Sequence, residues 1–242
     1  MGPMASEKWP IRRRVYLMRH GAVDYFDADG RPFRPATVPL NAEGRRQAEA
    51  AARELADVPL DRVVCSGLPR TAQTAAVVAA GRGAEIEVRA DLREIEPGRL
   101  DAASFAALTA ADAERLFLGS LPADLTPESR FFNGETFGSL DTRAWPCFAA
   151  LLAERNWRRL LVVAHGVVNR LLLCRALGAG LSGIGAIEQD AGCVNVLDVM
   201  EDGRLLVRLV NHTPLTPSKH GLDRTTLEEL YEQFRRGRRE SQ

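Results

Sequence analysis

Two histidines of the sequence stand at the ends of apolar runs, and each is followed by a glycine. The run VYLM ends on Arg19, His20 and Gly21, and the run LLVVA ends on His165 and Gly166. A neutral imidazole can act as a nucleophile, and a guanidinium group matches the oxygens of a phosphoryl group. The two motifs therefore indicate a site that binds a phosphoryl group and forms a covalent bond to it.

Two further motifs carry residues that suit the same chemistry. Arg70 lies in CSGLPRTAQT, directly after an apolar segment, and Glu94 lies in DLREIEPG. An anionic substrate is expected to raise the pKa of a nearby carboxyl group, which can then protonate a departing alkoxide. The LRE pattern favours Glu94 for this task, while Glu87, Asp91 and Glu96 remain alternatives.

The elements that must position these residues can be predicted from hydrophobic patterning. Apolar, mostly β-branched runs predict strands over 14–18, 61–66, 84–90, 159–165, 193–199 and 204–210. Ala- and Leu-rich segments predict helices over 41–57, 69–81 and 166–178. Strands that alternate with helices predict an α/β fold of three layers, α/β/α, around a mostly parallel sheet. The last two strands are predicted to form a hairpin that turns at Asp202 and Gly203.

The carboxyl ends of parallel strands meet at one edge of such a sheet, where ligands bind. The two histidines, the two arginines and Glu94 are therefore expected to converge there. Helix N-termini at the same edge offer backbone N–H groups to an anion, and Gly21 and Gly166 allow close approach. Asn41 is expected to cap the first helix and, secondarily, to bind substrate. The predicted substrate-binding residues are Arg19, Gly21, Asn41, Arg70, His165 and Gly166.

Two segments fall outside this alternation. Residues 97–140 are richer in Phe, Pro and polar residues, and we expect them to form a small inserted lid over one end of the sheet. Residues 217–242 form a charged tail that is expected to be helical at 225–239. We expect residues 1–242 to form a single domain.

Composition narrows the partners and the location. Lys plus Arg and Asp plus Glu both number 32, so net charge gives no sign of a nucleic-acid partner. No apolar run approaches the roughly 20 residues of a membrane span. The four cysteines have no metal-like spacing, and most lie in apolar runs, which favours a reduced, cytoplasmic protein without a metal site. Oligomeric state is left open, with a homodimer among the options.

The motifs together resemble a known family. LMRHG, PLNAEGRRQA, CSGLPRTAQTA, DLREIEPG, NGETFGSL and VVAHGVVNRLLL are similar, in this order, to motifs of the histidine phosphatase superfamily, in its phosphoglycerate-mutase-like branch. The similarity extends over residues 14–199. It implies a reaction without metal or cofactor in which His20 becomes a phosphohistidine.

The resemblance also implies roles for the other four residues. By it, Arg19, Arg70 and His165 hold the phosphoryl oxygens and stabilise the transition state. Glu94 is then the proton donor to the leaving group and afterwards the base for water.

The sequence departs from the family pattern at positions that bear on the substrate. Ala22 and Phe26 replace polar residues that are frequent in the family, and Leu100 replaces an aromatic residue. Arg31 and Arg34, in the loop 24–39, are candidates to meet a second substrate anion. His212, after the last strand, is expected to be structural.

Three functions remain open at this point. The preferred function is a phosphomonoesterase that acts on a small phosphorylated metabolite. The first alternative is a phosphomutase, which would return the phosphoryl group to the substrate. A mutase needs more cationic residues around a closed pocket than the insertion carries, and hydrolysis is favoured for that reason. The second alternative is an inactive module that binds a phosphorylated ligand.

Overall fold

The computed structural model describes residues 12–27, 31–98 and 121–239, and they form an α/β fold around one six-stranded sheet. The order across the sheet is β3-β2-β4-β1-β5-β6. The first four are parallel, whereas β5 runs antiparallel to β1 and pairs with β6 in the predicted hairpin. The strands are β1 Arg13–Arg19, β2 Arg62–Cys65, β3 Ile86–Val88, β4 Arg159–Ala164, β5 Val194–Val199 and β6 Leu205–His212.

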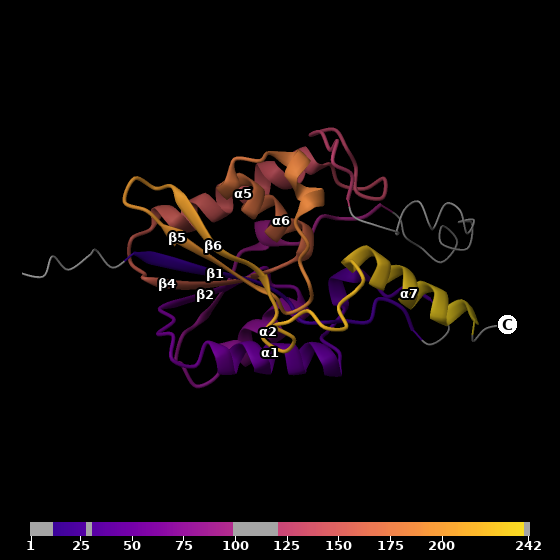
Figure 1. Ribbon diagram of the computed structural model, residues 1–242, viewed down its shortest axis with the longest axis horizontal. Helices are drawn as coiled ribbons and strands as arrows, with labels where there is room; N and C mark the ends of the chain where they lie inside the picture. Colours follow the sequence, from indigo (N-terminus) through magenta and orange to yellow (C-terminus); the bar gives the residue numbers. More distant parts are fainter. Residues whose placement is uncertain (1–11, 28–30, 99–120, 240–242) are drawn as a thin grey trace, which may run out of the picture.

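Helices cover both faces of the sheet, which confirms the three-layer prediction. Figure 1 shows α1 and α2 on one side and α5 and α6 on the other. The helices are α1 Ala42–Glu54, α2 Pro69–Val78, α5 Phe137–Ala153, α6 Gly166–Leu177 and α7 Thr226–Arg239, with short 3-10 helices at Pro35–Thr37, Ala90–Leu92 and Leu181–Ala186. Among the described residues, no helix is both long and apolar enough to cross a membrane.

Two apolar layers hold the sheet between its helices. Alternate residues of a strand point to opposite faces, so Val15 and Leu17 of β1 pack toward α5 and α6, while Tyr16 and Met18 pack toward α1 and α2. Strand β4 alternates in the same way and is buried on both faces. This double burial explains why the central strands read as continuous apolar runs.

The structure corrects two of the predicted boundaries. Helix α2 ends at Val78 rather than near Gly81. Helix α5 begins at Phe137, inside the predicted insertion 97–140, and it had not been expected at all. Residues 99–120 of that insertion lie outside the described residues, and so does Leu100.

The end of β1 is pressed against the start of α1. A Cβ atom on Gly21 would lie 2.3 Å from the carbonyl oxygen of Gly44, and a Cβ on Gly44 would lie 2.1 Å from the carbonyl oxygen of Ala22. Real Cβ atoms do not approach backbone so closely. Glycine at both positions therefore allows the loop after β1 to lie directly on α1.

Candidate active site

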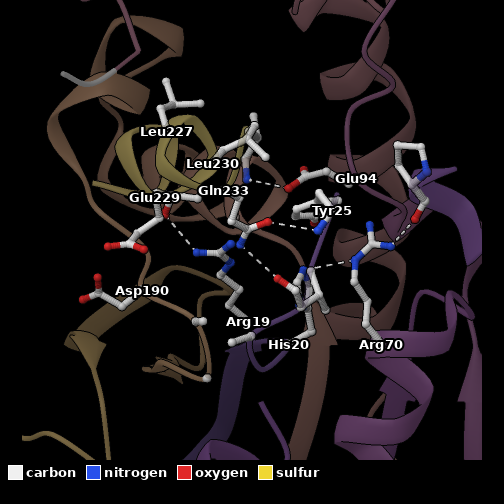
Figure 2. Close-up of a pocket in the computed structure, with 18 of the residues that line it drawn as sticks. Arg19, His20, Tyr25, Arg70, Glu94, Asp190, Leu227, Glu229, Leu230 and Gln233 are labelled. Atoms are coloured by element: carbon white, nitrogen blue, oxygen red, sulfur yellow. Dashed lines mark hydrogen bonds between the residues drawn. The ribbon is translucent and has the colours of Figure 1, made fainter. Parts of the chain in front are cut away.

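A pocket of about 480 Å³ opens at the carboxyl ends of the parallel strands (Figure 2). Its wall includes Arg19, His20, Arg70 and Glu94, together with Gly166 at the start of α6. These residues come from β1, α2, the segment after β3 and the β4–α6 junction. These residues therefore do meet at one edge of the sheet, as the sequence analysis predicted.

The ring of His20 is held in one tautomer. Its Nδ1 atom lies 2.7 Å from the carbonyl oxygen of Gly21, which can only accept a hydrogen bond, so Nδ1 carries the proton. The other ring nitrogen, Nε2, therefore has a free electron pair. Nε of Arg70 donates to that atom at 3.2 Å. The nitrogen that could attack phosphorus thus already faces a guanidinium group.

The two histidines face each other although they are far apart in the sequence. The ring centroids of His20 and His165 are 5.2 Å apart, with an angle of 65° between the planes. Both rings are buried, and burial holds the pKa of each well below 6.5, with Arg70 and Arg19 adding to the effect. Both imidazoles are accordingly neutral near pH 7, which is the nucleophilic form.

The two arginines at the site differ in how they are held. Arg70 is 2% exposed, and its second contact is a hydrogen bond of 2.5 Å to the carbonyl oxygen of Pro35. Arg19 donates to the carbonyl oxygen of Gln189 at 2.6 Å and to the hydroxyl of Thr226 at 2.9 Å. Its Nε atom is buried and has no hydrogen-bond partner among the described residues. That donor is available to an anion in the pocket.

A chain of hydroxyl groups fixes the tautomer of His165. The Thr71 hydroxyl donates to the carbonyl oxygen of Leu68 at 2.8 Å, so it accepts from Ser66 at 2.9 Å. Ser66, having given its proton to Thr71, accepts from Nε2 of His165 at 2.8 Å. The remaining nitrogen, Nδ1, is buried without a partner in the described structure. Ser66 and Thr71 are positioning residues that the sequence analysis did not identify.

Glu94 lies at the N-terminus of α6, beside His165. Its carboxylate accepts hydrogen bonds from the backbone N–H groups of Val167 at 3.2 Å and Val168 at 3.3 Å. This corrects one expectation, because these N–H groups had been assigned to the substrate anion and a carboxylate of the chain occupies them. Neither Glu87 nor Asp91 lies in the pocket wall, whereas Glu96 does.

A second ion pair fixes the segment that carries Glu94. Arg143 of α5 contacts the carboxylate of Glu135 through two hydrogen bonds of 2.8 Å. The same guanidinium donates to the carbonyl oxygens of Asp91, Arg93 and Glu94. Glu135 also accepts from the backbone N–H of Glu96. The sequence motif NGET thus serves to position the acid, a role that its position in the sequence alone did not reveal.

The predicted glycine and asparagine contacts have mixed outcomes. A Cβ on Gly166 would lie 3.6 Å from Nε of Arg19, so this glycine does face the site. Gly21 instead packs on Gly44 and is not in the pocket wall. Asn41 caps α1 by accepting from the N–H of Gly44 at 2.8 Å, and it also lies outside the wall.

The other sequence candidates lie away from the pocket. Arg31 and Arg34 are exposed, and neither contributes to the wall. They therefore do not meet a second substrate anion in this arrangement. His212 contacts the carboxylate of Glu54 at the end of β6, in agreement with a structural role.

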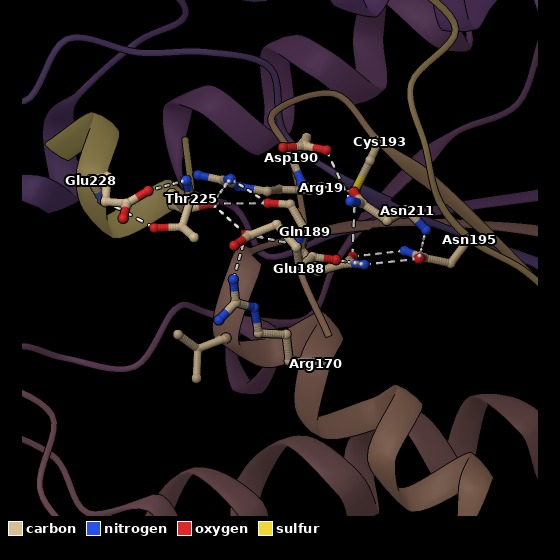
Figure 3. Close-up of polar contacts among 12 residues, drawn as sticks. Arg19, Arg170, Glu188, Gln189, Asp190, Cys193, Asn195, Asn211, Thr225 and Glu228 are labelled. Atoms are coloured by element: carbon tan, nitrogen blue, oxygen red, sulfur yellow. Dashed lines mark hydrogen bonds and ion pairs between the residues drawn. The ribbon is translucent and has the colours of Figure 1, made fainter. Parts of the chain in front are cut away.

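The C-terminal helix forms part of the pocket, which the sequence analysis missed. Thr226, Leu227, Leu230 and Gln233 of α7 line the wall (Figure 2). Its first turn joins the site, because Thr226 accepts a hydrogen bond from Arg19 and donates to Glu188 at 2.8 Å. Figure 3 shows Glu188 between Arg19 and Arg170, with which it pairs. The many charged residues of this segment had favoured a tail outside the site. The helical spacing of its apolar residues was the signal that one face of α7 packs against the protein.

Within 12–27, 31–98 and 121–239, no three His, Cys, Asp or Glu side chains form a cluster suited to a metal ion.

A three-layer α/β fold whose strand ends present two facing histidines and two buried arginines defines the class of histidine phosphatases. The family model for the histidine phosphatase superfamily (branch 1) matches residues 15–212. The chain therefore belongs to this superfamily, and the resemblance found in its motifs is confirmed.

Similar proteins in the family carry both phosphatase and mutase names. The chain is 32% identical over 166 residues to a probable phosphoglycerate mutase, GpmB, of Proteus mirabilis. The aligned residues cover 68% of this chain and 75% of the relative. The chain is 29% identical over 186 residues to the adenosylcobalamin/alpha-ribazole phosphatase of Escherichia coli, covering 77% and 90%. The crystal structure of a putative alpha-ribazole-5'-P phosphatase from E. coli superimposes with a TM-score of 0.69 at 26% identity, covering 84% and 97%.

Proposed function

We propose that the protein is a phosphomonoesterase that acts on a small phosphorylated metabolite through a phosphohistidine at His20. The observation that carries this proposal is the unprotonated Nε2 of His20, which the bond from Nδ1 to Gly21 leaves as an acceptor beside Arg70 in the pocket wall. Similarity to the alpha-ribazole phosphatase supports hydrolysis. Four free cysteines support a reducing compartment, and we propose the cytoplasm as the location.

The proposed reaction has two displacements at phosphorus. In the first, Nε2 of His20 forms a bond to phosphorus, the ester P–O bond breaks, and Glu94 gives its proton to the departing alkoxide. In the second, Glu94 takes a proton from water, the water oxygen attacks phosphorus, and the P–N bond breaks to release phosphate and neutral His20. Arg19, Arg70 and His165 stabilise the charge on the phosphoryl oxygens. Both steps use only side chains of this chain.

The alternative of a phosphomutase is less well supported by the charges of the pocket. A mutase must hold the second phosphate of a bisphosphate intermediate. Beyond Arg19 and Arg70, the pocket wall contains Arg93, Arg170 and Arg224. Arg170 is paired with Glu188, and Arg224 lies 3.6 Å from Glu229. With two of these three cations neutralised by carboxylates, hydrolysis is the function that the site supports best.

The test is the release of inorganic phosphate from p-nitrophenyl phosphate and from an alkyl phosphate, in excess EDTA. We expect the wild type to release phosphate from both esters. His20→Ala should lose turnover by at least about 10³-fold, the scale seen when a nucleophile is removed from a catalytic set. Arg45→Ala, an exposed change on α1, is the matched control and should retain full activity.

Glu94→Gln separates the acid from the nucleophile in the same experiment. A general acid contributes on the order of 10²- to 10⁴-fold where the leaving group is a strong base. The variant should therefore lose far more activity on the alkyl ester than on the aryl ester. Equal losses on both esters would contradict the proposed role of Glu94, and full activity of His20→Ala would overturn the mechanism.

A further inference from the structure

Much of the pocket wall is apolar. Val23 comes from the loop after β1, Ile95 and Phe131 come from the α5 side, and Leu227 and Leu230 come from α7. Figure 2 shows Leu227 and Leu230 above Arg19 and His20. The volume of about 480 Å³ falls within the range that holds drug-sized ligands, so it accommodates much more than a phosphoryl group.

Several polar side chains in the wall are already committed to partners in the protein. Gln233 accepts from the N–H of Tyr25 at 2.9 Å and donates to the carbonyl oxygen of Val23 at 3.2 Å. Gln47 accepts from the N–H of Ala22 at 2.8 Å. A sugar ring buries many hydroxyl groups, and each must find a partner or lose free energy. A polyhydroxylated substrate would have to break these bonds to use either of these two side chains.

Other polar side chains of the wall, Asp190 and Thr213, are also bonded to groups of the protein. Asp190 accepts from Lys219 at 2.6 Å. It also accepts from the side-chain amide of Asn211 at 2.9 Å (Figure 3). Thr213 donates to the carbonyl oxygen of Thr216 at 2.6 Å. Among the described residues, two buried side-chain donors of the wall have no partner, Nε of Arg19 and Nε of Arg170. The first belongs to the phosphoryl site itself, and the second is on a guanidinium group that already pairs with Glu188.

We infer that the substrate is a phosphomonoester of a large, predominantly apolar alcohol, and that α7 supplies the wall that selects it. The inference rests on the proposed phosphatase function. It deepens that function by assigning the class of alcohol, and by making Leu230 a specificity-determining residue. The bonds from Gln233 to the loop after β1 hold α7 in the position where Leu230 can contact the alcohol.

The test compares ethyl, butyl and octyl phosphate with glucose 6-phosphate by kcat/KM for phosphate release. These are esters of primary alcohols, so their leaving groups are alike and the comparison reports on binding. We expect kcat/KM to rise at least tenfold from ethyl to octyl phosphate. The ceiling is about fourfold per methylene, which corresponds to about 0.8 kcal/mol per buried CH₂. Glucose 6-phosphate should have a lower kcat/KM than octyl phosphate.

Two variants locate the selectivity on α7. Leu230→Ser should lower kcat/KM for octyl phosphate by about five- to tenfold, the loss expected when most of a leucine contact is removed. It should change ethyl phosphate by less than twofold. Leu177→Ser is the matched control, because Leu177 is 55% exposed at the end of α6 and lies outside the pocket wall.

Each result is decisive. A wild-type series that is flat with chain length, or a preference for glucose 6-phosphate, would overturn the inference while leaving the phosphatase function intact. If Leu230→Ser lowers kcat/KM equally for ethyl and octyl phosphate, α7 does not determine the specificity for the alcohol. Failure of the folded wild type to release phosphate from any ester, p-nitrophenyl phosphate included, would instead contradict the proposed function. The comparison of esters with the wild type tests the inference even if a variant fails to fold.

Discussion

The proton of His165 sits on Nε2, the nitrogen that contacts Ser66, and not on Nδ1. The chain from Leu68 through Thr71 and Ser66 requires Nε2 of His165 to be the donor. The unpartnered Nδ1 then carries an electron pair, which repels an anion rather than binding it. A dianion in the pocket would favour protonation of Nδ1, because a nearby negative charge raises the pKa of an imidazole. Binding and proton uptake should therefore be coupled at this one residue.

We predict that the protein takes up a proton when it binds sulfate, a dianion that does not itself titrate near pH 7. Linkage then makes its affinity fall as pH rises, by at most about tenfold per pH unit for one proton. Isothermal titration calorimetry in buffers of different ionisation enthalpy measures the uptake directly. His165→Gln should abolish it. Uptake that persists in this variant would place the proton on another group of the site, such as His20 or Glu94, and contradict the assignment.

The sequence predicted the residues that converge at the strand ends better than the residues that hold them in place. His20, His165, Arg19 and Arg70 follow or flank strand ends, and parallel strands bring such ends together whatever the details of packing. Ser66, in contrast, acts through a hydrogen bond to a residue 99 positions away. No local pattern indicates such a contact, so only the folded chain could identify it.

At the scale of elements, the two helices that the sequence analysis misjudged are the two that complete the site. Helix α5 contains Pro146 and starts in a segment rich in Phe and polar residues, which obscured its helical pattern. Its Arg143 nevertheless fixes the segment of Glu94. Helix α7 is amphipathic, but the partner of its apolar face was the pocket rather than the sheet. The spacing of apolar residues predicts that one face of a helix is buried. It does not indicate which surface of the protein that face packs against.

The junction of β1 and α1 gives a prediction at the same scale. In Gly44→Ala, the new Cβ would lie 2.1 Å from the carbonyl oxygen of Ala22, so the loop after His20 must move. Overpacking of this kind costs about 1–3 kcal/mol of stability, although alanine favours a helix. Urea unfolding should show the loss, and phosphate release should fall with it. Arg45→Ala, one residue further along α1, is the control. A Gly44→Ala protein as stable and active as the wild type would show that this contact does not position His20.

At the scale of the whole molecule, the fold keeps two neutral histidines in its interior. The pKa values of His20 and His165 are both lowered, mainly by burial, whereas an unfolded histidine titrates near about 6.5. The unfolded chain therefore binds more protons than the folded chain once the pH falls below that value. The stability from these residues is fully present above it, and is lost as the pH falls toward the folded pKa values.

The free energy of unfolding, measured with urea at several values between pH 7.5 and pH 5.5, should therefore decrease as the pH is lowered. The slope approaches about 1.4 kcal/mol per pH unit for each of the two histidines. Glu87, Glu135 and Glu188, whose pKa values are also lowered, contribute losses only near and below about pH 4.5, outside this window. The double variant His20→Gln/His165→Gln should flatten the profile, and either single variant should remove part of the slope. If the double variant keeps the full wild-type slope, the titrating groups lie elsewhere, and the site does not hold its histidines neutral.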